Sequence, residues 1–388
     1  MHDRLRVLCT STGGAGHVHA LSPVAQALRD RGHDVRWAVA PDGADTVGEL
    51  GFEWSPAGLT TLERRKAAGT SLSEIMQLPM AQRRGPLFAA LFARAAGPVM
   101  LRELGPIVDR IRPHVVVRET GEVAAAPIAA ARGIPLVTVA FSGVIPEPAR
   151  EQVIHDLRPL WRDTGLGDPS WADVYGQLYL HPFPASFGQR PDTPVVRPVR
   201  PGRGASSDTP PDWVVTLGAD RPFIYVTSGT EPPSVTFPWR ELFAVARERD
   251  VDVVATIGPH VEPTTLGAIP ANVRVERFVP HAHLLPRAST VISHGGAGTV
   301  LGAAAHGRPQ LVIPLFADQW ENGVAVDDAG CGIVMAPDRR SAEDLDRSVR
   351  TLLASPSHHD AATRVATEIA AMPAATAAAA DIEALIAT

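Results

Sequence analysis

The sequence predicts an α/β protein made of two halves, each a doubly wound parallel sheet with helices on both faces. Short apolar strands alternate with helical segments along the chain, which is typical of parallel sheets that are buried on both sides. This alternation stops in a Pro-, Arg- and Gly-rich stretch at residues 188–215 and then restarts. A chain of 388 residues is long enough for two domains of ordinary size.

The first half begins with a predicted strand at residues 5–9, which is followed by a glycine cluster at residues 13–16. Apolar residues at helical spacing predict a helix that covers residues 21–28 and ends at Gly32. The remaining expected elements of this half are strands at residues 35–39, 115–117 and 136–139 and a helix at residues 123–131.

The second half repeats this order after the interdomain linker. Its expected strands cover residues 223–226, 251–257, 273–275, 290–293 and 310–313, and its helices cover residues 239–249, a segment from Gly298 onward, and residues 341–354. The Ala-rich tail at residues 361–388 is expected to be helical. We therefore expect an N-terminal domain at residues 1–200, a C-terminal domain at residues 213–370, and a last helix at residues 371–388 that packs back toward the N-terminal domain.

Composition and charge exclude several classes of protein. The formal net charge is −6 and the isoelectric point is about 6.2, so the chain lacks the basic surface that nucleic-acid-binding proteins use. Two cysteines, Cys9 and Cys331, are too few for a disulfide framework or a cysteine-based zinc site. No signal peptide and no membrane-spanning pattern is evident, and we expect a cytoplasmic protein. The sequence leaves the oligomeric state open, including a homodimer.

Residues 291–299 carry the strongest functional signal. A buried strand leads directly into His294, Gly295 and Gly296, and a helix is expected from Gly298. Glycines let a ligand approach the backbone closely, and the free N–H groups at a helix start attract anions. This pattern indicates a site for the diphosphate of a nucleotide, where His294 adds a hydrogen-bond donor or a positive charge. The alternative is a tight strand-to-helix turn that binds nothing.

A second polar pair, Asp318 and Gln319, follows the next predicted strand. Because parallel strands end at the same edge of a sheet, this pair and His294 are expected on one rim. A carboxylate and an amide together can accept hydrogen bonds from sugar hydroxyl groups and donate to them. For Asp318 the alternative is a simple helix N-cap.

The run from His294 to Thr299, followed after about twenty residues by Asp318, Gln319 and Asn322, resembles the nucleotide-sugar signature of family 1 glycosyltransferases. The chain resembles the bacterial branch that glycosylates polyketide, macrolide and enediyne aglycones. This resemblance covers nearly the whole chain and implies a GT-B fold, in which two Rossmann-like domains face each other across a cleft. It also implies the residues that bind the donor: Ser228, Gly229, Thr230, Phe278, Val279, His294, Gly296, Gly298, Thr299, Asp318, Gln319 and Asn322.

His17 matches the family's Gly-His position and is the expected catalytic base. The start of a helix disfavours the imidazolium ion, so the ring is expected to be neutral and able to accept a proton. The family places a supporting carboxylate after a strand about a hundred residues further on, which makes Glu119 the candidate and Glu122 the alternative. The family's usual residue there is Asp. The other interpretation of His17 is a helix-start residue that binds only the backbone.

Two apolar stretches are expected to line the acceptor site, with Phe88 and Phe92 in one and Phe141 and Ile145 in the other. For each of these side chains the alternative is a place in the ordinary core. Asp-x-Asp pairs occur at residues 250–252 and 344–346, but their place at a helix end and within a helix indicates solvated acids rather than metal ligands. We therefore expect no metal site.

Together these residues predict a metal-independent, inverting glycosyltransferase. It would move a sugar, a deoxysugar by analogy with the family, from a TDP- or UDP-sugar to a hydroxyl of a small hydrophobic natural-product aglycone. The nucleotide sugar is a co-substrate, and no cofactor is expected. Two alternatives stay open: a nucleotide-sugar 2-epimerase on the same fold, and a non-catalytic nucleotide-binding helper of another glycosyltransferase.

Overall fold

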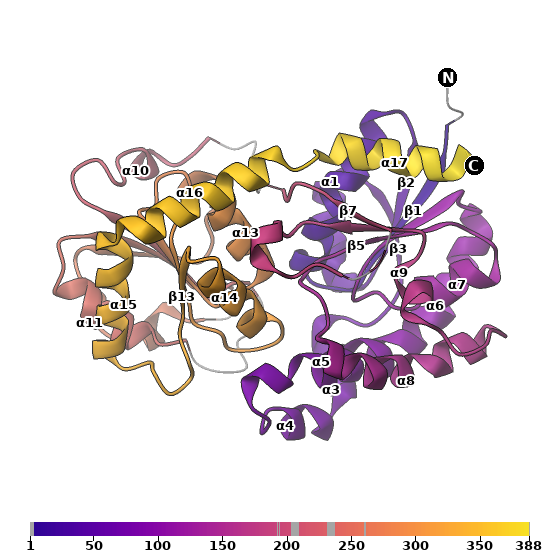
Figure 1. Cartoon of the computed structure of the whole chain (residues 1–388), viewed down its shortest axis with the longest axis horizontal. Helices are drawn as coiled ribbons and strands as arrows, with labels where there is room; N and C mark the ends of the chain where they lie inside the picture. The colour runs from indigo at the N-terminus through magenta and orange to yellow at the C-terminus, as the bar shows by residue number, and fades with distance from the viewer. Residues whose placement is uncertain are drawn as a thin grey trace. The chain divides into compact units, whose positions relative to one another are not determined.

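The computed structural model shows two compact units, each built on one parallel sheet (Figure 1). The structure describes residues 4–191, 193, 195–202, 209–230, 237–259 and 261–387. The first unit comprises Met1–Phe183, Arg190–Arg200 and Pro373–Thr388, and the second comprises Pro184–Gln189 and Pro201–Met372. The predicted fold class, two doubly wound α/β domains, is confirmed.

The first sheet places β1 and β4 side by side. Among the described residues it has seven strands in the order β3-β2-β1-β4-β5-β6-β7, and all neighbours are parallel. The strands are β1 (Arg6–Ser11), β2 (Asp34–Val39), β3 (Glu53–Pro56), β4 (Val115–Glu119), β5 (Leu136–Val139), β6 (Leu178–His181) and β7 (Val196–Pro198). The chain adds β2 and β3 on one side of β1 and then crosses back to add β4 on the other. In open α/β sheets, ligands bind outside the strand ends at such a reversal.

In the first unit, the chain between β3 and β4 forms a series of helices from α3 to α6. The helices are α1 (Ala15–Asp30), η1 (Pro41–Gly43), α2 (Ala44–Glu49), α3 (Thr61–Ala68), α4 (Thr70–Ile75), η2 (Met80–Gln82), α5 (Arg84–Phe88), η3 (Ala89–Ala96), α6 (Gly97–Ile111), α7 (Ala125–Ala131), α8 (Glu147–Asp163), α9 (Trp171–Tyr175) and α17 (Ala375–Ala387). The helix η3 is a π-helix that continues α5 into α6, and α3, α5, α6 and α8 all contact it. Such wide turns are frequent at functional sites.

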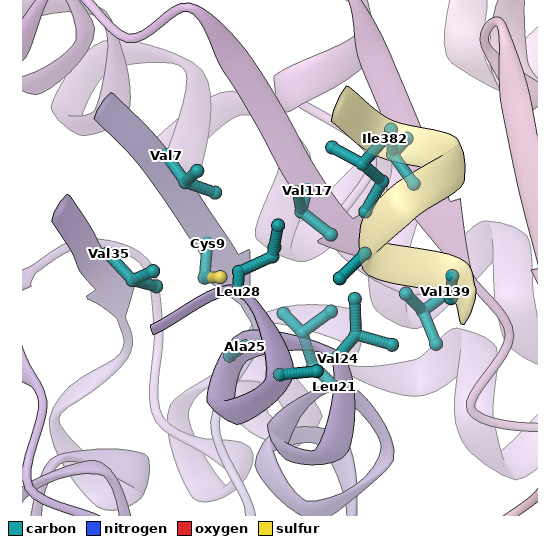
Figure 2. Close-up of a cluster of buried hydrophobic side chains, with 14 of the residues drawn as sticks. Val7, Cys9, Leu21, Val24, Ala25, Leu28, Val35, Val117, Val139 and Ile382 are labelled. Carbon is teal, nitrogen blue, oxygen red and sulfur yellow. The ribbon is translucent and has the colours of Figure 1, made fainter. Parts of the chain in front are cut away.

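The core of the first unit lies between the sheet and helices α1 and α17 (Figure 2). Alternate residues of a strand face the same side, so Val7 and Cys9 of β1 both enter this core. The apolar positions of α1 that meet them recur at helical spacing: Leu21, Val24, Ala25 and Leu28. Ile382 of α17 is completely buried in the same cluster. Burial of a side chain of this size contributes about 1.5–3 kcal/mol.

The second sheet repeats the reversal with β8 and β11. Among the described residues it has six parallel strands in the order β10-β9-β8-β11-β12-β13. They are β8 (Phe223–Thr227), β9 (Asp252–Thr256), β10 (Val273–Glu276), β11 (Thr290–Ser293), β12 (Gln310–Val312) and β13 (Gly332–Val334). Alternate residues of β8 serve two cores, with Ile224 and Val226 on one face and Phe223 and Tyr225 on the other.

The helices of the second unit follow its strands. They are η4 (Ala185–Phe187), α10 (Asp212–Val215), α11 (Trp239–Arg247), η5 (Pro263–Leu266), α12 (His281–Leu284), α13 (Ala297–Ala305), α14 (Gln319–Asp328), α15 (Ala342–Ala354) and α16 (Pro356–Ala371). Ser341 caps α15 by accepting the N–H of Asp344 at 3.1 Å, which satisfies a donor that the helix itself leaves free.

The apolar C-terminal stretch, drawn in yellow in Figure 1, divides into α16 and α17. Among the described residues, Pro356–Ala387 is long and apolar enough to cross a membrane by length and composition alone. However, Met372 is extended, with ψ of 145°, and Pro373 follows it, so the helix is interrupted. α16 packs on α13, and α17 packs on α1. These contacts within the two units account for the apolar residues of the stretch.

Glu383 fastens α17 to the first unit. Its Oε1 lies 2.7 Å from Nε of Arg31 and 2.8 Å from Nε2 of His33. The N–H of Leu5 donates to Nδ1 of His33 at 3.3 Å, so the ring hydrogen is on Nε2 and faces the carboxylate. The hydrogen bond from Arg31, aided by His33 and opposed by burial, lowers the pKa of Glu383 to about 2. The carboxylate therefore stays ionised at neutral pH.

The expected linker at residues 188–215 is only partly correct. Arg190–Arg200 belongs to the first unit, where β7 pairs with β6, and residues 203–208 lie outside the described residues. The expected N-terminal domain of residues 1–200 is also interrupted, because Pro184–Gln189 belongs to the second unit. A three-residue edge strand that ends in proline shows no periodicity, and for this reason the pattern did not reveal it.

We expect Glu383→Gln to lower the melting temperature (Tm) by about 2–4 °C near pH 7, because the charge that holds α17 is lost. Folding lowers the pKa of Glu383, so its stabilisation is complete above its ordinary value of 4.5 and is lost as the pH falls toward about 2. The difference in Tm between variant and wild type should therefore shrink below pH 4.5. Glu343→Gln, at an exposed pair with Arg347, is the matched control. Equal losses in the two variants would contradict the assignment.

Candidate functional site

The first candidate site lies where β1 and β4 end. β1 ends at Ser11, and the chain turns at Gly14, whose φ of 98° lies in the region that favours glycine. This turn places His17 in the first turn of α1, opposite Glu119 at the end of β4. Nδ1 of His17 lies 3.2 Å from Oε1 of Glu119, although the angle at Nδ1 falls outside hydrogen-bond geometry. Contacts of catalytic histidines commonly align only when substrate binds.

Glu119 is held as a buried carboxylate by several donors. The N–H and the hydroxyl of Thr12 donate to Oε1 at 3.0 and 2.9 Å, and the N–H of Gly121 donates to Oε2. Burial alone opposes ionisation, but the neighbouring His17 and these hydrogen bonds outweigh it and lower the pKa of Glu119 well below its ordinary value. The ionised Glu119 can therefore stabilise a positive charge that forms on His17.

Glu122, the alternative carboxylate, has a different environment. Its Oε2 accepts the Thr10 hydroxyl at 2.6 Å, and its Oε1 accepts the N–H groups of Ala124 and Ala125 at the start of α7. Burial raises the pKa of Glu122. In the part of the chain that the structure describes, Glu119 rather than Glu122 contacts His17.

Three phenylalanines, here called the aromatic cluster (Phe88, Phe92 and Phe141), converge on His17. The ring centroid of Phe141 lies 4.3 Å from that of the imidazole, and the Phe92 centroid lies 5.7 Å from it. Phe88 packs on Phe92 at 5.1 Å. Ile145, the fourth expected acceptor residue, is buried in the segment before α8. His17 thus has an apolar neighbourhood, and 13% of its side chain is exposed.

The second candidate site lies where β8 and β11 end. His294 directly follows β11, and its N–H donates to the carbonyl of Thr227 at 3.2 Å. A Cβ atom added to Gly229 would lie 2.6 Å from Cε1 of the imidazole, and one added to Gly296 would lie 2.5 Å from Nε2. Only glycine leaves room for the ring at both positions. The structure therefore brings together His294 and two glycines that the family resemblance assigns to the donor, Gly229 and Gly296.

Burial determines the charge state of His294. It lowers the pKa of His294 to about 4, although the nearby Asp318 carboxylate and the Thr227 backbone oppose the shift. This shift favours the neutral ring near pH 7, so of the two expected roles of His294 it favours the hydrogen-bond donor. Nδ1 is buried, and among the described residues it has no hydrogen-bond partner.

The other residues assigned to the phosphates differ in how accessible they are. Gly298 is exposed in the first turn of α13, and a Cβ added there would meet nothing within 4 Å. Thr230 is also exposed. By contrast, Thr299 is buried, and the buried hydroxyl of Ser228 donates to the carbonyl of Ile257 at 3.2 Å. Ser228 therefore fixes its loop, while the open start of α13 offers free N–H groups.

The side chain of Gln319 organises the loop after β12. Its Oε1 accepts the N–H groups of Leu315 and Phe316 at 2.7 and 2.8 Å. Because these two donors occupy the oxygen, only the NH₂ group remains for a ligand. Ala317 has φ of 56°, an unfavourable conformation for a residue with a Cβ atom, and it directly precedes Asp318. The loop is therefore constrained next to the predicted sugar-binding pair.

Asn322 connects this loop to the phosphate glycines. Its Nδ2 donates to the carbonyl of Gly295 and to Oδ2 of Asp318, both at 2.9 Å. Asn322 is completely buried and holds Gly295 and Asp318 in place, and its assignment to the donor stays a prediction. Asp318 stands at the N-cap of α14 without a capping hydrogen bond, which does not support its interpretation as a simple cap.

Phe278 and Val279 follow β10 on the same rim. The N–H of Gly258 donates to the carbonyl of Arg277 at 3.0 Å, and a Cβ on Gly258 would lie 2.5 Å from the carbonyl oxygen of Gly229. Gly258 therefore lies between Arg277, the residue before Phe278, and the loop that contains Gly229. Phe278 is 65% exposed, whereas Val279 is buried. An exposed aromatic ring at a polar rim is available to stack on a base.

The described residues contain no group of three or more His, Cys, Asp or Glu side chains that could hold a metal ion. The Asp-x-Asp acids form ion pairs instead. Arg221 lies 3.5 Å from Asp250 and 2.6 Å from Asp252, and Arg249 pairs with Asp346.

Two Rossmann-like units, with a glycine loop beside His294 in one and a His–Glu pair in the other, are the features expected of a GT-B glycosyltransferase. Residues 240–385 match the family model described as Erythromycin biosynthesis protein CIII-like, C-terminal domain. The chain is 31% identical to Elloramycin glycosyltransferase ElmGT of Streptomyces olivaceus over 95% of its length and 94% of the relative's. It is 30% identical to 4'-demethylrebeccamycin synthase of Lentzea aerocolonigenes, with 94% and 96% covered.

Among solved structures, spinosyn rhamnosyltransferase SpnG complexed with thymidine diphosphate superposes with a TM-score of 0.82 at 24% identity, and covers 98% of this chain and all of that one. The chain belongs to the family 1 glycosyltransferases of antibiotic biosynthesis, which have the GT-B fold. The protein is therefore a glycosyltransferase, and the relatives described here give no support to the epimerase alternative.

The sequence pattern does not reveal the residues that hold the two sites together. Thr12 and Gly121 each lie within two residues of a strand end, which is a weak signal that could have marked them. The hydrogen bonds from Thr12 to Glu119 join segments that are 107 residues apart in the chain, and one sequence does not reveal such a pairing. The same is true of the bond between Asn322 and Gly295.

We expect Gly296→Ala to destabilise the protein by about 1–3 kcal/mol, because the added methyl group would overlap the His294 ring. Thermal unfolding measures this loss. In a His294→Ala background the same change should cost little, since the overlapping ring is absent. Gly298→Ala, at an open position in the same helix, should leave the Tm unchanged. An equal loss with and without His294 would show that the ring is not the constraint.

Proposed function

We propose that the protein catalyses an inverting transfer of a deoxysugar from a TDP-sugar to a hydroxyl of a hydrophobic natural-product aglycone. The observation that carries this proposal is the buried contact of His17 with Glu119. Once substrate binding aligns a hydrogen on Nδ1 with Glu119, Nε2 keeps a lone pair and can accept the proton of the acceptor hydroxyl. Glu119 then stabilises the imidazolium ion. The acceptor oxygen attacks the anomeric carbon in one displacement, which inverts its configuration.

The aromatic cluster supports the acceptor class. Phe92 and Phe141 pack against the proposed base, and Phe88 extends this apolar surface through Phe92. Such a surface favours a flat, hydrophobic acceptor over a polar sugar. Apolar surroundings also strengthen the electrostatic interaction between Glu119 and the histidine that has taken a proton.

The second unit supports the donor class. The start of α13 offers free N–H groups and the positive end of a helix dipole, and neutral His294 adds a donor for the diphosphate that leaves. The structurally similar SpnG is named a rhamnosyltransferase and was solved with thymidine diphosphate. Rhamnose is a deoxysugar, so we assign a TDP-deoxysugar to this chain and keep UDP as the alternative nucleotide. Phe278 is the proposed stacking surface for the base.

Asp318 and Gln319 are assigned to the sugar. The Asp318 carboxylate can accept from sugar hydroxyl groups, and the NH₂ group of Gln319 can donate to one. Asn322 keeps both next to the phosphate glycines.

We expect His17→Ala to lower kcat about 10²–10⁴-fold on an alcohol acceptor at pH 7, the usual contribution of a general base. The dissociation constant for TDP should not change, because His17 lies in the first unit and the nucleotide loops lie in the second. Glu119→Gln should cost less, and it should add little once His17 is gone, because it acts through the histidine.

Glu122→Gln is the control for this series, since Glu122 caps α7 and does not touch His17. It should affect the Tm and leave the kcat of the folded enzyme near that of wild type. Near-full turnover of His17→Ala would contradict the assignment of the base. If Glu122→Gln lowers kcat and Glu119→Gln does not, the supporting carboxylate is Glu122 rather than Glu119.

Gln319→Glu isolates the role of the amide nitrogen. The new carboxylate keeps the acceptors for Leu315 and Phe316 but cannot donate to the sugar, so transfer should fall about tenfold or more while TDP binding holds. Gln319→Ala also removes the oxygen that accepts the N–H groups of Leu315 and Phe316, so it should lower both the transfer rate and the Tm more than Gln319→Glu does. Comparable losses of TDP affinity and of transfer in Gln319→Glu would show that the residue serves the nucleotide instead.

We further propose that transfer needs no metal ion. The start of α13 and His294 can take the charge of the diphosphate, a role that a divalent cation plays in other nucleotide-sugar enzymes. Activity measured after treatment with EDTA and desalting should match that of untreated enzyme. Loss of activity that magnesium or manganese restores would contradict this expectation.

A further inference from the structure

A buried guanidinium group, that of Arg84, has donors that the protein does not use. Arg84 begins α5 and is only 7% exposed. Its Nη2 donates to the hydroxyl of Ser142 at 2.8 Å and to the carbonyl of Gly143. Nε and Nη1 are buried, and within the described part of the chain they have no hydrogen-bond partner. Three of the five N–H groups of this side chain are therefore unpaired.

Arg84 lies next to the aromatic cluster and the catalytic base. Its partner Ser142 directly follows Phe141, whose ring centroid is 4.3 Å from that of His17. Phe88 follows Arg84 by four residues in α5, so both side chains lie on the same face of the helix. The group is thus at the edge of the surface that we assign to the acceptor.

No carboxylate of the described chain lies within ion-pair distance of Arg84. The nearby Tyr179 does not supply a negative charge, since burial raises the pKa of its hydroxyl. The buried carboxylates of Glu119 and Glu122 attract Arg118 instead. A buried charge without a partner is costly, and arginine keeps its charge in proteins. The site therefore favours an anion that comes from outside the chain.

We propose that Arg84 binds an acidic oxygen of the acceptor, a carboxylate or an ionised phenol, and thereby selects acceptors that carry such a group near the hydroxyl to be glycosylated. This inference rests on the proposed function, because it names a feature of the acceptor. A guanidinium group recognises such oxygens through short charge-assisted hydrogen bonds.

The competing interpretation is that Arg84 only holds the turn at Ser142 and Gly143. A purely structural arginine would affect all acceptors equally. A residue that binds an acidic oxygen would instead discriminate between an acid and its neutral ester. The comparison of these two ligands is therefore the informative measurement.

The test measures binding of 3-hydroxy-2-naphthoic acid and of its methyl ester to the full chain by ligand fluorescence at pH 7, without donor. Wild type should bind the acid about 10- to 100-fold more tightly than the ester, the range of a buried charge-assisted hydrogen bond. Arg84→Met should abolish this preference, and Arg84→Lys, which keeps the charge without the planar group, should retain part of it. Arg83→Met is the matched control, because the neighbouring Arg83 donates to the carbonyl of Leu78 and should not affect the preference.

Equal affinity of wild type for acid and ester would overturn the proposal, and so would an undiminished preference in Arg84→Met. If Arg84→Met does not fold, the wild-type comparison and Arg84→Lys still decide. Binding is measured without sugar transfer, so the outcome is independent of catalysis. An intact preference for the acid in a protein that glycosylates no acceptor would contradict the proposed function and leave the assignment of Arg84 standing.

Discussion

The reversal of strand order in each parallel sheet is the constraint on which both sites depend. In the first sheet it places the ends of β1 and β4 side by side, and in the second those of β8 and β11. The strands beside each reversal are largely apolar and buried, and the loops where they end carry the polar side chains of the two sites. The His17–Glu119 pair and the loops around His294 therefore both lie at a reversal of strand order, one in each sheet.

The two sites use opposite electrostatics within similar backbone geometry. Each depends on glycine where the chain leaves a strand, at Gly14 in one unit and at Gly229 and Gly296 in the other. Hydrogen bonds and His17 keep Glu119 ionised despite its burial, whereas burial keeps His294 neutral despite the nearby Asp318. The first unit thus holds a negative charge next to His17, the proposed proton acceptor. The second holds neutral donors, which suit a diphosphate that already carries its own charge.

Much of the fold could be predicted from the sequence because buried parallel strands are short and uniformly apolar. The strands next to both sites were placed within about two residues, and His17 was placed near its carboxylate. What could not be predicted depends on contacts between distant segments or on short irregular elements. β7 is too short to show a period, the π-helix η3 has the composition of an α-helix, and the buried role of Asn322 depends on a carbonyl 27 residues away. Arg84 was missed because its burial is a tertiary property that an isolated arginine in a sequence does not reveal.

The central claim is that one histidine, supported by one carboxylate, activates the acceptor for a single displacement. The anomeric configuration of the product tests this claim most directly. Transfer from an α-linked TDP-sugar to an alcohol acceptor, followed by measurement of the anomeric proton coupling by nuclear magnetic resonance, should give a β-linked product. An α-linked product would require two displacements or a front-face reaction and would contradict the role assigned to the His17–Glu119 pair.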